Sequence, residues 1–426
     1  MTARTVHVIG AGLAGLSAAV RLADRGERVV LHDAAKQAGG RCRSYVDPTL
    51  GLSIDNGNHL LLSGNRASLD YVTLVGGERA LTVAADARFD FADLASGERW
   101  QVRPNAGRIP WWIASPSRRV PGTHLREYLA PLGLLRAKSG TRIDAAMRCS
   151  GPLWERLWRP VLLAALNTEP AESDAGLAAP VLRETLAAGS EACRPIVATG
   201  GLSAAFIAPA LAFLSKRGAE IRLGGRLRAL EPAGSNVARL LFTDGTVEMA
   251  SGDAVVLSVP PWIATELLPG LSVPDEHRAI VNAHFKIAPA SRQPLVLGTL
   301  NSVTEWIFAY EDRVSVTISA GDRLFDTPRE ILAASLWDEV SRATGLPADL
   351  PRWQVVKEKR ATFAATPEQN SRRPDASTSL GNVVLAGDWT ATGLPATIEG
   401  AIRSGQKAAT LLQRGDTGDL RSVPKA

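Results

Sequence analysis

Apolar runs at the start of the chain alternate with a glycine turn and a helical pattern. Residues 5–9, Thr-Val-His-Val-Ile, form a β-branched run that predicts a buried strand. Residues 10–15, Gly-Ala-Gly-Leu-Ala-Gly, follow at once and lead into the alanine-rich pattern of residues 16–22, which Gly26 ends. Residues 28–32 predict a second strand. The order strand, turn, helix and strand predicts an α/β unit with parallel strands.

The turn carries glycine at the three positions that bind a dinucleotide phosphate. Gly10 allows a tight turn, Gly12 lets the backbone approach a pyrophosphate, and Gly15 allows the helix to pack closely on the strand. Asp33 stands 23 residues after Gly10, where a carboxylate should bond ribose hydroxyls. The predicted phosphate-binding residues are Gly10, Ala11, Gly12, Leu13, Ala14 and Gly15. A glycine turn in another kind of α/β protein is the alternative.

The residues that follow indicate which dinucleotide, FAD or NAD, the turn binds. Residues 33–41, Asp-Ala-Ala-Lys-Gln-Ala-Gly-Gly-Arg, resemble the extended fingerprint of the flavoprotein amine oxidase and phytoene desaturase superfamily. The resemblance implies FAD rather than NAD, with Asp33 and Ala34 beside the ribose. Gly40 would let the main chain pass close to the cofactor, and Arg41 can neutralise its diphosphate. Asp33 replaces the more usual Glu and Gln37 a frequent Arg, so the ribose contact is less direct.

A second signal lies near the other end of the chain. Residues 382–386 predict a strand that ends in Gly387 and Asp388, and residues 395–405 open a helix. In the resembling superfamily, such an Asp bonds the ribityl or phosphate part of FAD. A helix N-terminus stabilises the negative charge of a reduced flavin. The residues assigned to this start are Ala396, Thr397 and Ile398.

The middle of the chain resembles the return of the superfamily to its nucleotide domain, where a strand near Leu227 lays its backbone against the adenine. The fold expected is therefore α/β, a discontinuous Rossmann-type FAD-binding domain with an inserted α+β substrate domain. FAD-binding parts are expected at 1–75, 196–262 and 376–415. A substrate and membrane-contact segment is expected at 76–195, a substrate domain at 263–375 and a tail at 416–426.

Several stretches narrow the resemblance. Residues 39–45, 54–65, 158–160, 164–168 and 395–400 look like the squalene-associated FAD-dependent desaturase family, the hydroxysqualene dehydroxylases of bacterial hopanoid biosynthesis. This resemblance implies that reduced FAD supplies a hydride to an allylic cation after the hydroxyl of hydroxysqualene leaves. The partner implied is a long-chain isoprenoid substrate. The sequence has no second dinucleotide turn for NAD, so the electron donor is unidentified.

Such a reaction needs a proton donor and an apolar channel. His59 is the candidate donor by residue type, because the unperturbed pKa of histidine lies near neutrality. It follows Gly57 and Asn58, where the superfamily chain runs along the flavin, and Asn58 is assigned to the catalytic site with it. The alternative is that His59 and Asn58 only hydrogen-bond the cofactor or the backbone. Asp55 is a second choice that reads more readily as a turn residue.

Tryptophan and arginine gather in two short segments. Residues 109–114 and 152–163 hold four of the ten tryptophans, flanked by arginines. Trp154 and Trp158 are four residues apart and would share a helix face. One hypothesis is a monotopic membrane contact through which an isoprenoid enters. The other is ordinary core tryptophan with solvated arginine.

Composition excludes several classes of protein. The chain has 426 residues, of which 45% are hydrophobic and 21% charged, and a formal net charge of +5. These values are typical of a globular protein, and they indicate neither disorder nor nucleic-acid binding. Its three cysteines are too few and scattered for a disulfide framework or a metal site, which favours a cytoplasmic location. The apolar stretch 195–215 carries Pro209 and is expected to be a buried helix after a turn.

Three rival functions share the expected fold. A carotenoid or phytoene desaturase passes hydride in the opposite direction, from hydrocarbon to oxidised flavin. A flavin amine oxidase typically places an aromatic cage near the flavin, whereas Trp389 is the one aromatic residue between Gly387 and Gly405. A non-catalytic prenyl-protein escort module does not use flavin, and the intact glycine turn argues against it.

Overall fold

The structure is a computed structural model that describes residues 4–414. Its centre is a parallel sheet with the strand order β10-β2-β1-β14-β20. The strands are β10 (Glu220–Leu223), β2 (Arg28–Asp33), β1 (Thr5–Ile9), β14 (Ala254–Leu257) and β20 (Val383–Leu385). They come from three distant stretches of the chain, so the sheet is complete only when both ends and the middle of the chain meet.

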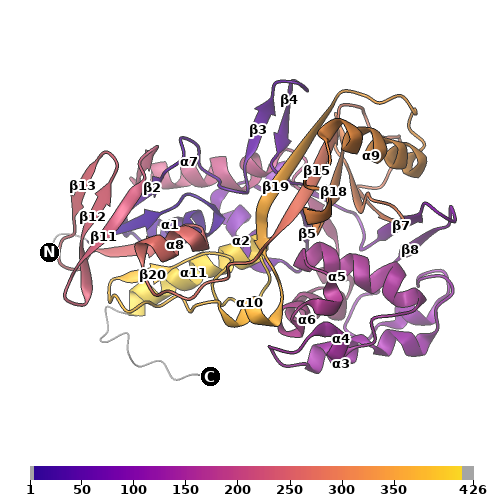
Figure 1. Cartoon of the computed structure of the whole chain (residues 1–426), viewed down its shortest axis with the longest axis horizontal. Coiled ribbons are helices and arrows are strands. Elements are labelled where there is room, and N and C mark those ends of the chain that lie inside the picture. Colours follow the sequence, from indigo (N-terminus) through magenta and orange to yellow (C-terminus); the bar gives the residue numbers. More distant parts are fainter. Residues whose placement is uncertain (1–3, 415–426) are drawn as a thin grey trace.

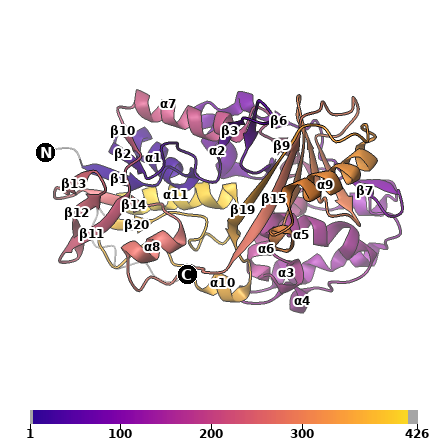
Figure 2. The ribbon, with the colours of Figure 1, turned by 45° about the horizontal axis from the view of Figure 1, so that its top comes forward.

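The two faces of this sheet are covered differently (Figures 1 and 2). Because side chains alternate along a strand, Val6 and Val8 of β1 face one side and Ile9 faces the other. Val6 and Val8 pack in one cluster with helices α1 (Leu13–Asp24), α7 (Ala208–Lys216) and α11 (Ile398–Arg414). Ile9 packs in a cluster shared with β11 (Leu227–Ala233), β12 (Asn236–Phe242) and α8 (Pro261–Leu267). Strand β13 (Gly245–Glu248) completes the small antiparallel sheet of β11 and β12.

Beside this core stands a seven-stranded sheet, whose long strands β15 and β19 run through the middle of the molecule in Figure 2. Its pairs are antiparallel except for the parallel pair β16 and β7. The strands, in spatial order, are β19 (Trp353–Phe363), β15 (His277–Phe285), β18 (Val314–Ile318), β17 (Trp306–Ala309), β16 (Val296–Leu300), β7 (Phe89–Asp93) and β8 (Arg99–Val102). Helix α9 (Arg329–Thr344) covers one face with Leu332, Leu336 and Trp337.

Helices close the other side of this sheet, at the lower right of Figure 1. They are α3 (Pro131–Arg136), α4 (Ile143–Ala146), α5 (Arg159–Leu166) and α6 (Ala175–Glu184). The remaining elements are α2 (Arg66–Val75), α10 (Pro367–Ser371), the hairpin β3 (Ser44–Asp47) with β4 (Leu52–Asp55), and the sheet of β5 (Leu60–Leu62), β9 (Pro195–Val197) and β6 (Thr82–Val83). Short 3-10 turns connect several of them.

Most predicted elements near the glycine turn are confirmed, including the strands at 5–9 and 28–32. The stretch 195–215 is corrected in part, because its first three residues form strand β9. A π-helical turn, Ser203–Ile207, then leads into α7, and Pro209 stands in the first turn of α7, where proline is tolerated. The tail predicted at 416–426 lies outside the described residues.

Candidate functional site: a shared cavity

A cavity of about 1280 Å³ lies where the parallel sheet meets the seven-stranded sheet. It is larger than the roughly 300 to 1,000 Å³ of most small-molecule sites. Its walls include the carboxyl ends of β1 and β2, at Ile9 and Asp33, and the segment after β14 at Ser258. Since the chain leaves β1 for β2 on one side and β14 lies on the other, this is the crevice where open parallel sheets bind their ligands.

The glycine turn leaves room for a phosphate at one position and none at the others. A Cβ on Gly12 would meet no atom within 4 Å, although Gly12 lines the cavity. On Gly10 it would lie 2.2 Å from the Ser258 carbonyl oxygen, and on Gly15 it would lie 1.9 Å from the Gly10 carbonyl oxygen. Gly12 therefore keeps a cradle open at the start of α1, while Gly10 and Gly15 allow close packing.

Of the predicted cofactor residues, Ala11 and Gly15 do not line the cavity. The backbone N–H of Ala11 donates to Asp33 Oδ2 at 2.6 Å, and that of Ala35 donates to Asp33 Oδ1 at 2.7 Å. An ionised carboxylate has about four acceptor sites. Two therefore remain on Asp33 for ribose hydroxyls, and Leu13, Ala14 and Ala34 line the wall beside it.

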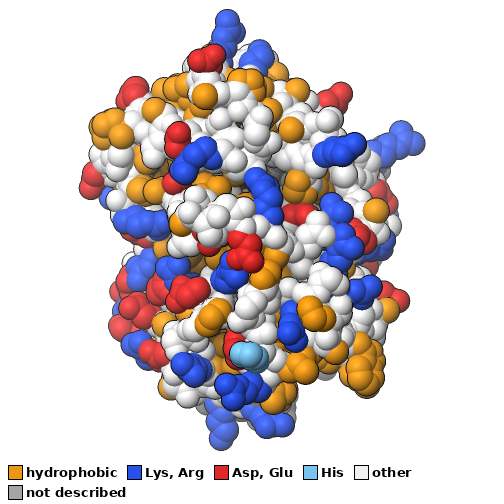
Figure 3. Space-filling view, turned by 90° about the vertical axis from the view of Figure 1, so that its right-hand side faces the viewer, with side chains coloured by type: hydrophobic (Ala, Val, Ile, Leu, Met, Phe, Trp, Pro, Cys, Tyr) orange, Lys and Arg blue, Asp and Glu red, His pale blue; other side chains and the backbone are white. Residues whose placement is uncertain are grey.

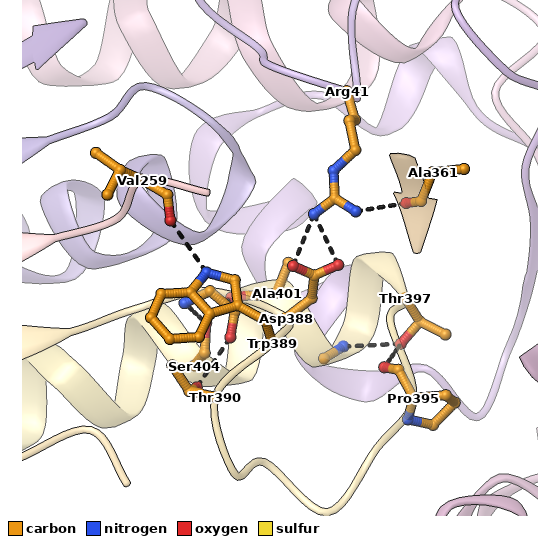
Figure 4. A network of polar contacts seen from close by, with 12 residues as sticks. Arg41, Val259, Ala361, Asp388, Trp389, Thr390, Pro395, Thr397, Ala401 and Ser404 are labelled. Atoms are coloured by element: carbon orange, nitrogen blue, oxygen red, sulfur yellow. Dashed lines mark hydrogen bonds and ion pairs between the residues drawn. The ribbon is translucent and has the colours of Figure 1, made fainter. Parts of the chain in front are cut away.

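Arg41 and Asp388 were expected to make separate cofactor contacts, but the structure pairs them with each other. Both oxygens of Asp388 accept from Arg41 Nη2 at 2.7 Å, and Arg41 Nη1 donates to the Ala361 carbonyl oxygen at 2.5 Å (Figure 4). Asp388 is buried, and the Arg41 side chain keeps 48% of its exposed area, facing the cavity. The pair thus fixes a guanidinium beside Gly40 and Gly387, which also line the cavity.

The start of α11 also faces the cavity through Ala396, Thr397 and Ile398. Thr397 Oγ1 accepts from the Gly400 N–H at 3.0 Å, which caps the helix (Figure 4). The first N–H groups of a helix have no partner within the helix and carry partial positive charge. This end of α11 therefore suits a group that becomes negatively charged.

The adenine end expected near Leu227 is lined by residues of β11 and β2. Leu227 is buried and lines the cavity with Arg226, Arg228 and His32. The His32 ring stacks on Phe242 at 4.6 Å and contacts His7 Nδ1 through its Nε2 at 3.2 Å. Burial lowers the pKa of His32 to about 3, with smaller contributions from His7 and Arg222. At this end of the cavity the neutral ring of His32 therefore lies beside Arg226 and Arg228.

Asn58 and His59 follow Gly57 but point to different surroundings. Asn58 is buried, donates from Nδ2 to the Val316 carbonyl oxygen at 3.2 Å, and accepts from Tyr310 at 3.1 Å. His59 lines the cavity and has no hydrogen-bond partner among the described residues. Burial, with the charge of Arg41, lowers the pKa of His59 to about 4. The pKa of His59 in the fold therefore lies below the unperturbed histidine value from which it was chosen as a candidate donor.

A further part of the cavity wall is mainly apolar. It extends between the seven-stranded sheet and helices α5 and α6. Its apolar walls include Phe89, Val102, Leu157, Val161, Leu162, Ala165, Leu182, Leu186, Trp306 and Phe308. One cavity thus joins a phosphate cradle to a set of apolar walls.

The tryptophan hypothesis is corrected in part. Trp154 and Trp158 are buried within a π-helical turn, Trp154–Trp158, and Trp112 is buried against Tyr128. Because they belong to one hydrophobic core, these three do not form a surface. Trp111 differs, since 69% of it is exposed.

Two functional candidates were missed by sequence reasoning. Asn282 lines the cavity from the middle of β15, and Glu399 lines it from the first turn of α11. Glu399 is buried and accepts from Ser68 Oγ at 2.6 Å and from Arg403 Nε at 2.9 Å. The signal for Asn282 was a polar residue within the apolar run Ala279–Ala283 of β15.

Neither a metal-binding cluster nor a membrane-crossing helix is found within residues 4–414. No group of three His, Cys, Asp or Glu side chains in this range could hold a metal ion. No helix in the same range has the length and apolar character needed to cross a membrane.

Comparisons with known proteins agree with this geometry. The model of the family of flavin-containing amine oxidoreductases matches residues 13–413. The chain is 53% identical over 410 residues to a hydroxysqualene dehydroxylase of Rhodopseudomonas palustris, covering 96% of this chain and 98% of the relative. It is 50% identical over 408 residues to a hydroxysqualene dehydroxylase of Sinorhizobium fredii, with the same two coverages.

A solved structure shares the fold at low identity. Cyclohexylamine oxidase of Brevibacterium oxydans superposes with a TM-score of 0.70 and 17% identity, covering 98% of this chain and 100% of that one. At this identity the likeness concerns the fold alone.

Proposed function

The chain belongs to the family of flavin-containing amine oxidoreductases, and from this premise we propose that it reductively removes the hydroxyl group of hydroxysqualene to give squalene. FAD is its cofactor. The open cradle at Gly12, the free acceptor sites of Asp33 and the N-terminus of α11 fit such a group. The observation that carries the proposal is the continuous cavity of about 1280 Å³, in which this cradle adjoins apolar walls that suit an isoprenoid chain.

The reaction replaces a C–O bond by a C–H bond. The substrate oxygen must gain a proton and leave as water, and the carbon must gain a hydride. FAD, when bound and reduced, supplies the hydride. The apolar walls keep water from capturing the carbon cation, and this exclusion also strengthens every electrostatic contact within the site.

We propose His59 as the proton donor of this step. With a pKa of about 4, only about one molecule in a thousand carries the imidazolium at pH 7, but that form is a stronger acid than an ordinary histidine. His59 lines the cavity beside Gly57 and is free of described hydrogen-bond partners, so its ring is available to a ligand. The Asn58 side chain already makes hydrogen bonds to β18 and to Tyr310, which suits a positioning residue.

One experiment tests the proposed function directly. The purified protein is reduced anaerobically, mixed with hydroxysqualene, and the lipid products are separated. We expect squalene to accumulate as the flavin absorbance returns. Absence of squalene with substrate present would overturn the proposal, and dehydrogenated product from oxidised protein and phytoene would favour a carotenoid desaturase.

We also propose a peripheral membrane contact at residues 108–138, called the apolar-basic segment below. It exposes large apolar side chains: Ile109, Trp111, Leu125, Leu129 and Leu132. Exposed cations stand among them, and none of these forms an ion pair within the described part of the chain: Arg108, Arg118, Arg126, Arg136 and Lys138. Figure 3, which looks at this end of the molecule, shows apolar side chains among Lys and Arg.

The apolar-basic segment lies close to the apolar end of the cavity. The Ser190 N–H donates to the Asn105 carbonyl oxygen at 2.9 Å, and a Cβ on Gly189 would lie 2.4 Å from the Gly107 carbonyl oxygen. Leu186, three residues before Gly189, lines the cavity. An isoprenoid that leaves a bilayer at this segment would therefore have a short path to the cavity, which supports the proposed membrane contact.

A further inference from the structure

Strand β15 turns the polar side chain of Asn282 toward the cavity, which His277 at the start of the strand also lines. Its alternate residues Val281, Ala283 and Phe285 pack under α9, so Ile280 and Asn282 face the opposite way and line the cavity. Asn282 is 99% buried, yet its Nδ2 has no hydrogen-bond partner among the described residues. Because an unpaired buried donor is destabilising, such groups usually have a ligand or water as partner.

The orientation of the Asn282 amide is fixed by its neighbours. The backbone N–H of Asn58, which can only donate, donates to Asn282 Oδ1 at 3.3 Å. The Thr317 hydroxyl donates to the same oxygen at 2.8 Å and accepts from Asn58 Nδ2 at 3.1 Å. Tyr310 fixes Asn58 in turn by donating to its Oδ1. A flipped amide would oppose two donors, so Nδ2 must be the free atom.

Asn282 Nδ2 lies near another polar group of the cavity, the ring of His59, which has no hydrogen-bond partner among the described residues. A Cβ on Gly57 would be 3.4 Å from Asn282 Nδ2 and 3.9 Å from His59 Nε2, so both nitrogens flank Gly57. Together, Asn282 and His59 are called the polar pair here. The pair lies where the FAD-binding part of the cavity meets apolar walls such as Trp306 and Phe308.

We propose that Asn282 is a substrate-binding residue that donates a hydrogen bond from Nδ2 to the hydroxyl oxygen of the substrate, opposite the ring of His59. This inference rests on the proposed function. Beside apolar walls such as Trp306 and Phe308, a donor at this position holds the hydroxyl group at a defined point along the chain and favours binding of an alcohol over the hydrocarbon product. Thr317 and Asn58 are positioning residues that hold the amide in this orientation.

The test compares how tightly the oxidised holoprotein binds hydroxysqualene and squalene. Binding is measured through the change in flavin absorbance. Wild type should bind the alcohol about tenfold more tightly, the size of one buried hydrogen bond. Asn282→Ala should bring this ratio close to one. Thr317→Val should lower the ratio by a smaller factor, because it frees the amide to rotate. FAD content, measured in the same samples, should stay at the wild-type level.

The control is Phe308→Leu, which alters an apolar wall of the same cavity and should weaken both ligands equally. If Asn282→Ala fails to fold, Asn282→Asp, which keeps an acceptor for Asn58 and Thr317, replaces it at pH 8. An unchanged ratio in the Asn282 variant, or loss of FAD with equal weakening of both ligands, would refute the inference. If wild-type protein converts hydroxysqualene but binds both ligands equally, the role of Asn282 is refuted and the proposed function stands. If wild-type protein neither binds nor converts hydroxysqualene, both the role of Asn282 and the proposed function are refuted.

Discussion

At the scale of single residues, Gly12 and Gly15 should respond oppositely to alanine. Gly12 has an extended backbone that alanine tolerates, with a φ of −73°, and open space around it. Gly12→Ala should therefore fold with wild-type stability but bind FAD at least tenfold more weakly, because the methyl group fills the phosphate cradle. Apoprotein melting and FAD titration measure the two effects.

Gly15→Ala is the matched variant. Its Cβ would overlap the Gly10 carbonyl oxygen, so α1 must move away from β1, and we expect a loss of about 3 kcal/mol of unfolding free energy. Gly12→Ala with unchanged FAD affinity, or Gly15→Ala with unchanged stability, would contradict this division of roles.

The lowered pKa of His59 gives a prediction for the pH dependence of turnover. Between pH 8 and 6 the fraction of imidazolium rises about tenfold for each unit that pH falls, because both values lie above the pKa of about 4. The single-turnover rate should rise in the same way if His59 is the donor. His59→Gln should abolish this slope with FAD retained. A wild-type rate that is flat over this range would exclude the donor role.

The residues of the site that belong to a local sequence motif could be predicted from the sequence, whereas the contacts between distant side chains could not. Gly12 and Asp33 were predictable, because a short local motif fixes both their spacing and their chemistry. The pairing of Arg41 with Asp388 was not, since it joins residues far apart in the sequence. Asn282 was missed for a related reason: its importance depends on which strand face the cavity takes.

At the scale of elements, strands β1 and β2 carry a buried histidine pair that should make the fold acid-sensitive. The pKa of His32 falls from 6.5 in the unfolded chain to about 3 in the fold, so the unfolded state gains the proton first as pH falls. Stability from this residue is complete above pH 6.5 and is lost as pH falls toward 3. From pH 7 to 5 the loss is about 2 kcal/mol.

In His32→Gln the free energy of unfolding should fall less between pH 7 and pH 5, by that same amount. Urea unfolding at both pH values measures this difference. The control, His124→Gln, changes a histidine exposed to solvent and should leave the decline as in wild type. An equal decline in wild type and His32→Gln would show that the strand pair does not set the acid limit.

The apolar-basic segment should bind anionic vesicles. Burying Trp111 in the interface is worth about 2 kcal/mol, so Trp111→Glu should lower the partition coefficient by more than tenfold in a flotation assay. The cations add attraction that 1 M salt should remove. The matched control is Ile331→Glu on α9, which is also exposed but stands outside the segment. Holoprotein that does not float, or equal loss in both variants, would rule out the contact.

At the scale of the whole molecule, the first sheet was predictable and the second was not. Strands β1, β2 and β20 lie next to glycine turns that can be recognised in the sequence. Strands β15 to β19 form a sheet whose pairings local sequence patterns do not encode. The parallel pair β16 and β7 brings residue 297 beside residue 90, for example. The substrate half of the cavity therefore emerges only from the assembled fold.

Because the cavity has a cofactor part and an apolar part, we expect that conversion of hydroxysqualene can be blocked without loss of FAD. Ala165 lines the apolar part from α5, away from the glycine turn. Ala165→Trp should fill that part, so conversion of hydroxysqualene should fall at least tenfold while FAD content stays as in wild type. The control Ala334→Trp adds the same side chain at an exposed position of α9 and should change neither. Loss of FAD in Ala165→Trp would mean that the cofactor reaches into the apolar space, and unchanged conversion would mean that the isoprenoid binds elsewhere.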